Sequence, residues 1–382
     1  MNKKIAIIDA DLLDRGTRFP NLALMKIAGY QTFEEHNHVE LIEDWSKIDP
    51  STKGYEQYDH IYVAKVFDFT KIPINLNEIP ANKITKGGTG FFWTEAFNSS
   101  NRLPNVVEHY MPKYDLYDNF IAHEIARGIK PGKFTDYQEY SIGFTTRGCI
   151  RRCSFCVNCN STYVERWSPV SEFLADLTKY PNRKKIYLWD DNILAFPEWE
   201  SVLDELIETN RPFSFRQGMD IRLMTDAKAK KICSAKYIGD YTFAFDNYKD
   251  KKIILKGLAS WLKYAKKQTR LYILCGYKGQ SYLDIAETFM RIKILMKYKC
   301  IPYIMRHEFY KKSKYAGTYI NLARWCNQPS FFKKKSYREY CEANGTNSST
   351  MRYAKLFEKE HPHIAAAFYD MRFDLGGEKP KK

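Results

Sequence analysis

From Tyr140 onward, short apolar runs alternate with longer stretches that are apolar on one side only. The short runs predict six strands, at 140–146, 185–190, 213–218, 241–245, 270–276 and 301–306. The stretches between them predict six helices, at 169–180, 198–209, 226–235, 249–266, 282–299 and 315–327. Repeated β-then-α units with apolar strands form parallel sheets with right-handed crossovers. The pattern therefore predicts a partial (β/α)6 TIM-type barrel over 140–327, with any chemistry at the carboxyl ends of its strands.

The first 100 residues predict a separate, smaller α/β domain of the flavodoxin-like or Rossmann-like kind. Its expected strands are 4–9, 39–42, 58–64 and 83–90, with a helix over 22–35. Residues 101–139 are expected to connect the domains as ordered packing, not as free linker. Residues 328–382 form a basic extension with expected helices at 336–343 and 349–359 and a disordered tail at 376–382.

Composition limits the class of protein. No apolar run approaches the roughly 20 residues that span a bilayer. Nine cysteines in unrelated contexts indicate a reducing compartment, so we expect a cytoplasmic protein without a membrane partner. Lys and Arg outnumber Asp and Glu by 60 to 45, a net charge of +15. Such an excess either marks an anionic partner, nucleic acid above all, or reflects lysine as a default surface residue.

Three cysteines, Cys149, Cys153 and Cys156, lie on one predicted loop directly after the first barrel strand. Thiolates hold iron–sulfur clusters, which normally take four protein ligands. Three ligands from one loop would leave one iron open to a small molecule. A zinc site would need a second Cys or His pair, and none lies nearby at zinc spacing. Cys159 forms a C-x-x-C with Cys156 and is either a spectator thiol or a further ligand.

The spacing of these cysteines, with Phe155 before the third, resembles that of the radical S-adenosylmethionine (SAM) enzymes. The resemblance implies a [4Fe–4S] cluster held by Cys149, Cys153 and Cys156, which binds SAM at its open iron. Reductive cleavage of SAM would then give a 5′-deoxyadenosyl radical that abstracts hydrogen from a substrate. A reductant such as flavodoxin or ferredoxin would be a partner.

The same resemblance, to the methylthiotransferase and cobalamin-dependent branches, assigns SAM contacts at three further strand ends. Carboxylate and amide oxygens after the second strand would hold its amino group, and side chains after the third would hold its ribose and carboxylate. A residue at the end of the sixth strand would lie near the adenine. The predicted contacts are Phe155, Asp190, Asp191, Asn192, Gln217, Asp220, Arg222 and Met305.

Residues 1–100 resemble the flavodoxin-like domain that precedes the core in the cobalamin-dependent class, and Gly87-Gly88 falls where those domains carry a similar turn. The Asp-x-His-x-x-Gly pattern that supplies the lower ligand of cobalamin is absent, which argues against cobalamin as a cofactor. The turn from Gly87 to Gly90 is either an ordinary turn, which we expect, or a phosphate cradle. No RNA-binding β-barrel module and no second cysteine cluster is evident, which argues against methylthiotransferase activity.

Three functional hypotheses follow. The positive charge favours a radical SAM enzyme that modifies nucleic acid or a nucleotide. The missing RNA-binding module favours one that acts on a peptide or a metabolite. In the third, the protein is not an enzyme, and its iron–sulfur cluster serves redox sensing or binding.

Overall fold

The computed structural model describes residues 2–16, 19–93 and 101–373. The chain divides into two compact units, Met1–Asp191 with Ser201–Arg216, and Asn192–Glu200 with Gln217–Lys382. This division falls inside the segment predicted as one barrel, and the predicted bounds 1–100, 101–139, 140–327 and 328–382 remain predictions. None of the helices in the described part of the chain has the length and apolarity needed to cross a membrane.

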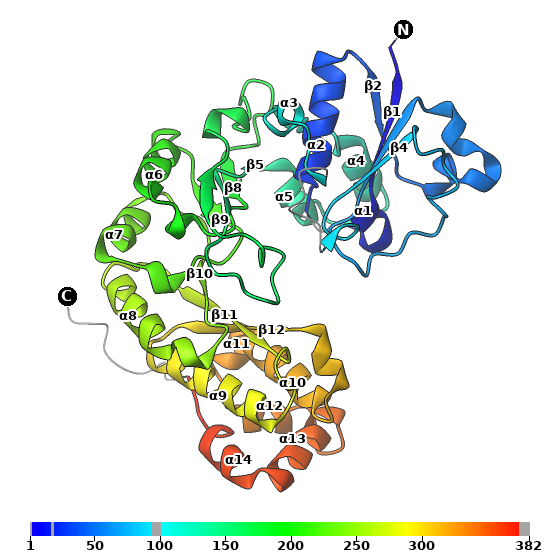
Figure 1. Cartoon of the computed structure of the whole chain (residues 1–382). Helices are drawn as coiled ribbons and strands as arrows, with labels where there is room; N and C mark the ends of the chain where they lie inside the picture. The colour runs from blue at the N-terminus through cyan, green and yellow to red at the C-terminus, as the bar shows by residue number, and fades with distance from the viewer. Residues whose placement is uncertain (1, 17–18, 94–100, 374–382) are drawn as a thin grey trace. The chain divides into compact units, whose positions relative to one another are not determined.

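The first unit begins with a four-stranded parallel sheet (Figure 1), in the order β2-β1-β3-β4. The strands are β1 (Lys4–Asp9), β2 (His38–Leu41), β3 (His60–Ala64) and β4 (Ile84–Gly87). The helices are α1 (Ala10–Arg15) and α2 (Leu22–Gly29), with a π-helical turn at Tyr30–Glu34. Three 3₁₀ turns follow at Trp45–Ile48, Pro50–Thr52 and Gly54–Gln57. All four predicted strands and the predicted helix are confirmed, and the strand order is that of flavodoxin-like sheets.

Side chains of β1 alternate between two apolar cores, as the period of a strand requires. Ile5 and Ile7 belong to one core, and Ala6 and Ile8 to the other. A parallel sheet covered on both faces buries its strands completely, which explains the unbroken apolar run after Lys4.

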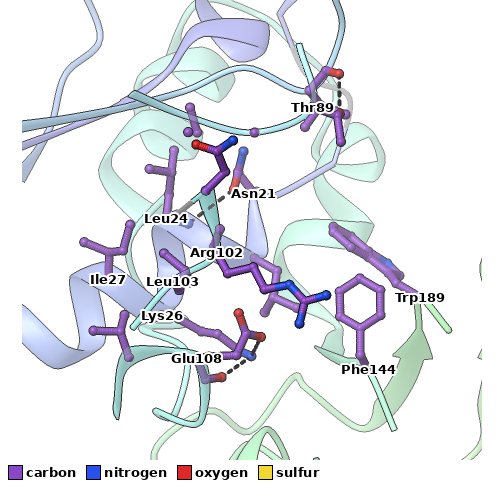
Figure 2. Close-up of a pocket in the computed structure, with 18 of the residues that line it drawn as sticks. Asn21, Leu24, Lys26, Ile27, Thr89, Arg102, Leu103, Glu108, Phe144 and Trp189 are labelled. Carbon is purple, nitrogen blue, oxygen red and sulfur yellow. Dashed lines mark hydrogen bonds and ion pairs between the residues drawn. The ribbon is translucent and has the colours of Figure 1, made fainter. Parts of the chain in front are cut away.

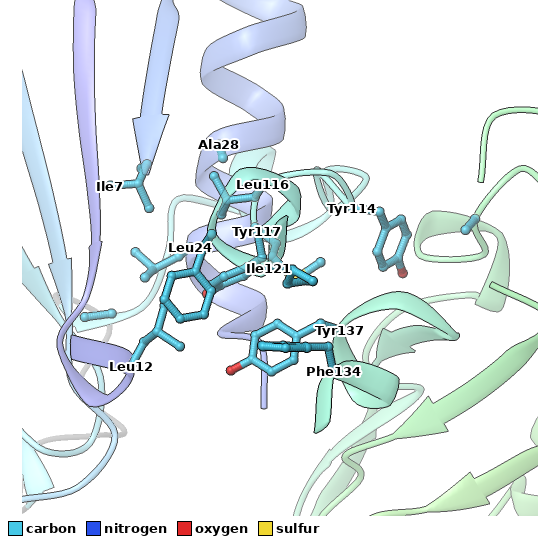
Figure 3. Close-up of a cluster of buried hydrophobic side chains, with 14 of the residues drawn as sticks. Ile7, Leu12, Leu24, Ala28, Tyr114, Leu116, Tyr117, Ile121, Phe134 and Tyr137 are labelled. Atoms are coloured by element: carbon cyan, nitrogen blue, oxygen red, sulfur yellow. The ribbon is translucent and has the colours of Figure 1, made fainter. Parts of the chain in front are cut away.

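The connecting segment is ordered, as predicted. Its helices are α3 (Asn105–Glu108), α4 (Asp118–Ala126) and α5 (Thr135–Gln138), with a 3₁₀ turn at Pro131–Phe134. Tyr114, Tyr117, Ile121, Phe134 and Tyr137 join the core under α2 (Figure 3). Burial of this many aromatic side chains ties the segment to the first sheet.

A second parallel sheet of the first unit has the order β5-β8-β9. Its strands are β5 (Tyr140–Gly143), β8 (Lys185–Leu188) and β9 (Phe213–Phe215), and a separate antiparallel pair is formed by β6 (Thr146–Gly148) and β7 (Val164–Arg166). Helix α6 (Trp199–Glu208) confirms the helix predicted at 198–209.

The helix predicted over 169–180 is wrong: this segment has only a 3₁₀ turn at Val170–Glu172. Side chains from other parts of the sequence accept hydrogen bonds from its backbone N–H groups. The Glu205 carboxylate accepts from Val170 N–H, and Ser141 Oγ accepts from Ala175 N–H at 3.0 Å. Asp176 accepts from Thr178 N–H at 2.8 Å, which forms a turn in place of a helix.

The second unit contains the parallel sheet β10-β11-β12 (Figure 1). Its strands are β10 (Tyr241–Ala244), β11 (Thr269–Cys275) and β12 (Ile301–Arg306). Its helices confirm those predicted: α7 (Asp226–Ser234), α8 (Lys251–Leu262), α9 (Tyr282–Lys297), α10 (Ala316–Cys326), α12 (Tyr337–Glu342) and α13 (Ser349–Glu360). Two short helices, α11 (Pro329–Phe332) and α14 (Pro362–Phe368), and 3₁₀ turns at Ile193–Ala195, Ile221–Leu223, Tyr248–Asp250 and Glu308–Lys312 complete it.

The six predicted barrel strands are therefore all present, in two three-stranded parallel sheets. The mixed α/β class with parallel sheets is confirmed, and the partial barrel remains a prediction. The tail predicted at 376–382 lies outside the described residues.

Candidate functional site

The cysteine loop connects the two strands of the β6–β7 hairpin. Thr146 pairs with Arg166 and Gly148 pairs with Val164, so residues 149–163 begin and end side by side. This hairpin was not predicted from the sequence. Closing a loop at its base restricts its conformations before any ligand binds, which lowers the entropy cost of bringing the cysteines together.

Gly148 sits at the start of this loop for a steric reason. Its φ is +98°, and an added Cβ would lie 2.3 Å from the carbonyl oxygen of Tyr163. Only glycine tolerates both conditions. Directly after it, Cys149 N–H donates to Ser161 Oγ at 2.9 Å, and Ser161 Oγ donates to the Tyr163 carbonyl at 3.1 Å. The two ends of the loop are thus joined at the first cysteine.

The three predicted cluster ligands interact within this loop. Burial, and to a lesser extent the neighbouring Asp191, Cys149 and Cys153, raise the pKa of the Cys156 thiol to about 11. The Cys156 sulfur accepts from Asn158 N–H at 3.4 Å. A thiol with a raised pKa is deprotonated when a metal centre binds it. An all-thiol ligand set of this kind suits an iron–sulfur cluster.

Within the described ranges, no three His, Cys, Asp or Glu side chains lie close enough to hold a single metal ion. The thiolates of a [4Fe–4S] cluster bind different irons, and so they stand farther apart than the ligands of one ion. Cys159 follows in the same loop, where its N–H donates to the Cys156 carbonyl at 3.1 Å. The five remaining cysteines are buried, and burial raises the pKa of Cys275 to about 12, which supports packing over reactivity there.

Asp190, predicted to contact SAM, holds the turn that leads into the cysteine loop. Its carboxylate accepts four hydrogen bonds, from Thr145 N–H (3.1 Å), Thr145 Oγ (2.5 Å), Thr146 N–H (2.6 Å) and Thr146 Oγ (2.7 Å). Burial raises the pKa of this carboxyl group, and the four bonds oppose that shift. Its protein partners give Asp190 a structural role, and its contact with SAM stays a prediction.

Asp191 connects both ends of the three-cysteine segment. One carboxylate oxygen accepts from Gly148 N–H at 3.0 Å, just before Cys149. The other accepts from Asn158 Nδ2 at 2.7 Å, just after Cys156. The predicted contact of Asp191 with SAM stays a prediction, and its hydrogen-bond partners were not predicted from the sequence. The hydroxyl-rich Thr145-Thr146 and the amide of Asn158 were signals for them, because buried carboxylates need such donors.

The remaining predicted contacts belong to the second unit, apart from Phe155, which lies half-buried in the cysteine loop. Asn192 is buried, Gln217 is exposed, and Met305 is 46% exposed at the end of β12. Arg222 is bound by two carboxylates: its Nε lies 2.7 Å from Asp220 and its Nη1 lies 3.0 Å from Asp250. The predicted SAM contacts of these residues stay predictions.

Arg216, on the chain just after β9, forms an ion pair with Asp136, with its Nη1 3.4 Å from a carboxylate oxygen. The Gly87–Gly90 turn packs on the chain after β3: Gly90 N–H donates to the Lys65 carbonyl at 2.9 Å, and Thr89 Oγ donates to the Val66 carbonyl at 2.7 Å. These bonds are those of an ordinary turn.

Comparison with known proteins gives little. No family model matches the sequence, and no curated protein is significantly similar to it. Among solved structures, the chain is similar to OxsB, described as a cobalamin-dependent S-adenosylmethionine radical enzyme with aqua-cobalamin and S-adenosylmethionine bound. The two share 12% identity and a TM-score of 0.36, too low to argue from. The match covers 96% of this chain and 56% of that one, so this chain spans little more than half its length.

Proposed function

We propose that this protein is a radical SAM enzyme. The observation that carries the proposal is the cysteine loop: Cys149, Cys153 and Cys156 share one segment that a hairpin, Ser161 and Asp191 close at both ends. A [4Fe–4S] cluster bound there would supply the reductive cleavage of SAM to a hydrogen-abstracting radical.

The protein's own residues would prepare this site. The Asp190 carboxylate fixes the turn before Cys149, and Asp191 fixes the separation of Gly148 from Asn158. A ligand loop held in this way keeps its thiols in place with or without a bound group. The partial barrel over 140–327 is part of the proposal and would draw three strands from each of the two parallel sheets. Phe155, Asn192, Gln217, Asp220, Arg222 and Met305 are proposed to contact SAM.

The substrate class is proposed only as far as charge supports it. The net charge of +15 favours nucleic acid or a nucleotide over a neutral metabolite. We propose a soluble electron donor such as flavodoxin or ferredoxin as the reductant, and cytoplasmic conditions for the cluster. Cobalamin is not part of the proposal.

The second candidate is an iron–sulfur protein without catalysis, in which the cluster senses redox state. One observation favours it: Arg222, the predicted partner of the SAM carboxylate, is already bound by Asp220 and Asp250. A bound guanidinium must exchange partners before it can bind a ligand.

Product analysis separates the two candidates. The anaerobically reconstituted protein is reduced with dithionite, mixed with SAM and assayed for 5′-deoxyadenosine by chromatography. A radical SAM enzyme yields this product, alone or when nucleotides and RNA are added as substrates. A protein that holds a full cluster, gives no product under these conditions and has an electron paramagnetic resonance spectrum that SAM leaves unchanged is the redox sensor.

A further inference from the structure

The first unit contains a pocket of about 700 Å³ that the proposed chemistry does not use (Figure 2). It opens at the carboxyl ends of three strands of the first sheet: Asp9 ends β1, Ala64 ends β3, and Gly87 ends β4. In an open parallel sheet of this order, ligands bind outside the carboxyl ends of the strands, at the point where the connections from neighbouring strands leave to opposite faces of the sheet. The volume lies within the range of small-molecule sites, about 300–1,000 Å³.

Aromatic rings form much of the wall of the pocket. Phe19 packs edge-on against Trp189 with ring centroids 5.8 Å apart, and Phe144 does so at 6.2 Å. Phe67 continues the same series, 6.4 Å from Phe19. Aromatic walls of this kind bind flat rings by stacking, at about 1–3 kcal/mol for a nucleic-acid base.

Two arginines add positive charge beside these rings. The Arg147 guanidinium lies 3.8 Å from the centroid of Phe144 and 5.1 Å from that of Trp167. The Arg102 guanidinium lies 5.8 Å from the centroid of Trp167, and Figure 2 shows it extending toward Phe144 and Trp189. Among the described residues, no carboxylate lies within ion-pair distance of Arg102, whereas Arg147 forms a loose ion pair with Glu108, with Nη2 3.8 Å from a carboxylate oxygen.

Two buried donors of the wall have no hydrogen-bond partner in the described part of the chain. They are Nε of Arg147 and the indole Nε1 of Trp189. A buried donor left in this state costs about 1–3 kcal/mol. Both side chains line the pocket, so a ligand that brings acceptor atoms would recover that free energy if the side chains turn toward it.

Three of the four acidic residues that line the pocket have hydrogen-bond partners within the protein. Glu108 accepts from Lys26 Nζ at 2.7 Å and from Trp167 Nε1 at 3.0 Å. Asp11 accepts from the N–H groups of Val66 and Phe67 and from the Thr70 hydroxyl. Burial raises the pKa of Asp9 to about 7, so its charge is partial at neutral pH. Glu165 is a further carboxylate in the wall, on the strand that pairs with Arg147.

We propose that this pocket binds a nucleotide: a flat base against the aromatic wall of Phe19, Phe144 and Trp189, with its phosphate at Arg102 and Arg147. Positive charge over aromatic faces suits a ligand that has both a ring and an anionic group. Gly148 and Ser161 also line the pocket, so the ligand would lie beside the first residue of the cysteine loop. The inference does not depend on the cluster or on SAM.

Isothermal titration calorimetry on the full chain tests the proposal with AMP, GMP, CMP and UMP. The matching nucleosides lack the charge, and inorganic phosphate lacks the ring. At least one nucleotide is expected to bind tenfold or more tightly than its nucleoside and than phosphate. A short single-stranded RNA presents the same base and phosphate: tighter binding of a hexamer identifies RNA as the source, and weaker binding identifies the free nucleotide.

Two variants locate the binding. Arg102→Gln removes an exposed charge and is expected to weaken nucleotide binding about tenfold while leaving nucleoside binding unchanged. Trp189→Phe keeps a ring, loses the indole N–H, and is expected to weaken both. Arg127→Gln, at an exposed arginine of the same unit outside the pocket, is the matched control. The proposal is overturned if no nucleotide binds more tightly than its nucleoside, or if Arg102→Gln binds nucleotides as tightly as the unchanged protein.

Discussion

Replacement of Asp190 by asparagine tests whether this carboxylate holds the cysteine loop. The substitution keeps the shape of the side chain but leaves one acceptor oxygen in place of two. One oxygen of Asp190 accepts three of the four bonds from Thr145 and Thr146, and the other accepts only Thr145 N–H. An asparagine placed to keep the three would turn its NH₂ group toward Thr145 N–H, leaving that donor unsatisfied.

The cost follows from these contacts. A buried unsatisfied N–H costs about 1–3 kcal/mol, and three bonds that lose their charged acceptor weaken by roughly half. Relief from burying a charge offsets part of this loss. The net expectation is a loss of about 3 kcal/mol, which lowers the Tm of a domain of this size by about 6–12 °C.

Thermal unfolding of the full chain, with iron content after reconstitution as a second measurement, checks this expectation. Asp190→Asn should unfold earlier and bind less than half the iron of the unchanged protein. Asp226→Asn is the control, because its exposed ion pair with Lys263 contributes little. An Asp190→Asn variant with an unchanged Tm and full iron content would refute the role assigned to this residue.

Two other residues of the first unit give further predictions. Gly148→Ala puts a Cβ 2.3 Å from the Tyr163 carbonyl oxygen at a φ of +98°. The variant should bind much less iron on reconstitution, while its circular dichroism spectrum stays unchanged. Full iron uptake would contradict this prediction. Burial raises the pKa of Asp9 from 3.8 to about 7. The protonated carboxyl group therefore contributes its full share to the free energy of unfolding below pH 4, and this contribution is lost as the pH rises through 7. Asp9→Asn should therefore gain about 3 kcal/mol relative to the unchanged protein between pH 5 and pH 8 in urea unfolding. A difference that stays constant with pH would show that Asp9 is ionised throughout.

Local pattern was enough to predict most elements of the fold. β1 and the strands of the two later sheets are short apolar runs. Helix α7 begins at the predicted residue 226, directly after Thr225, whose Oγ accepts from Lys228 N–H. Where prediction failed, distant side chains decided the structure. Residues 169–180 lack a helix because the side chains of Glu205 and Ser141 accept hydrogen bonds from two of their backbone N–H groups. No local sequence pattern reveals such distant partners.

Sequence alone singles out candidate residues for the site but not the hydrogen bonds that join them. The three cysteines and Asp190-Asp191 stand out by residue type and spacing. The two carboxylates accept hydrogen bonds from Thr145, Thr146 and Asn158. These contacts depend on how the end of β8 packs against the hairpin, which is a matter of tertiary structure. The hairpin itself has strands of only three residues, too short for an alternating pattern to be visible.

The central claim is that Cys149, Cys153 and Cys156 hold a cluster with one iron open to SAM. Its most direct test is electron paramagnetic resonance of the reconstituted, dithionite-reduced protein with and without SAM. The unchanged protein and Cys159→Ala should both give a [4Fe–4S]⁺ signal that SAM alters, while Cys153→Ala should give none. A signal that SAM leaves unchanged, or one that Cys159→Ala abolishes, would contradict a three-cysteine cluster with an open iron.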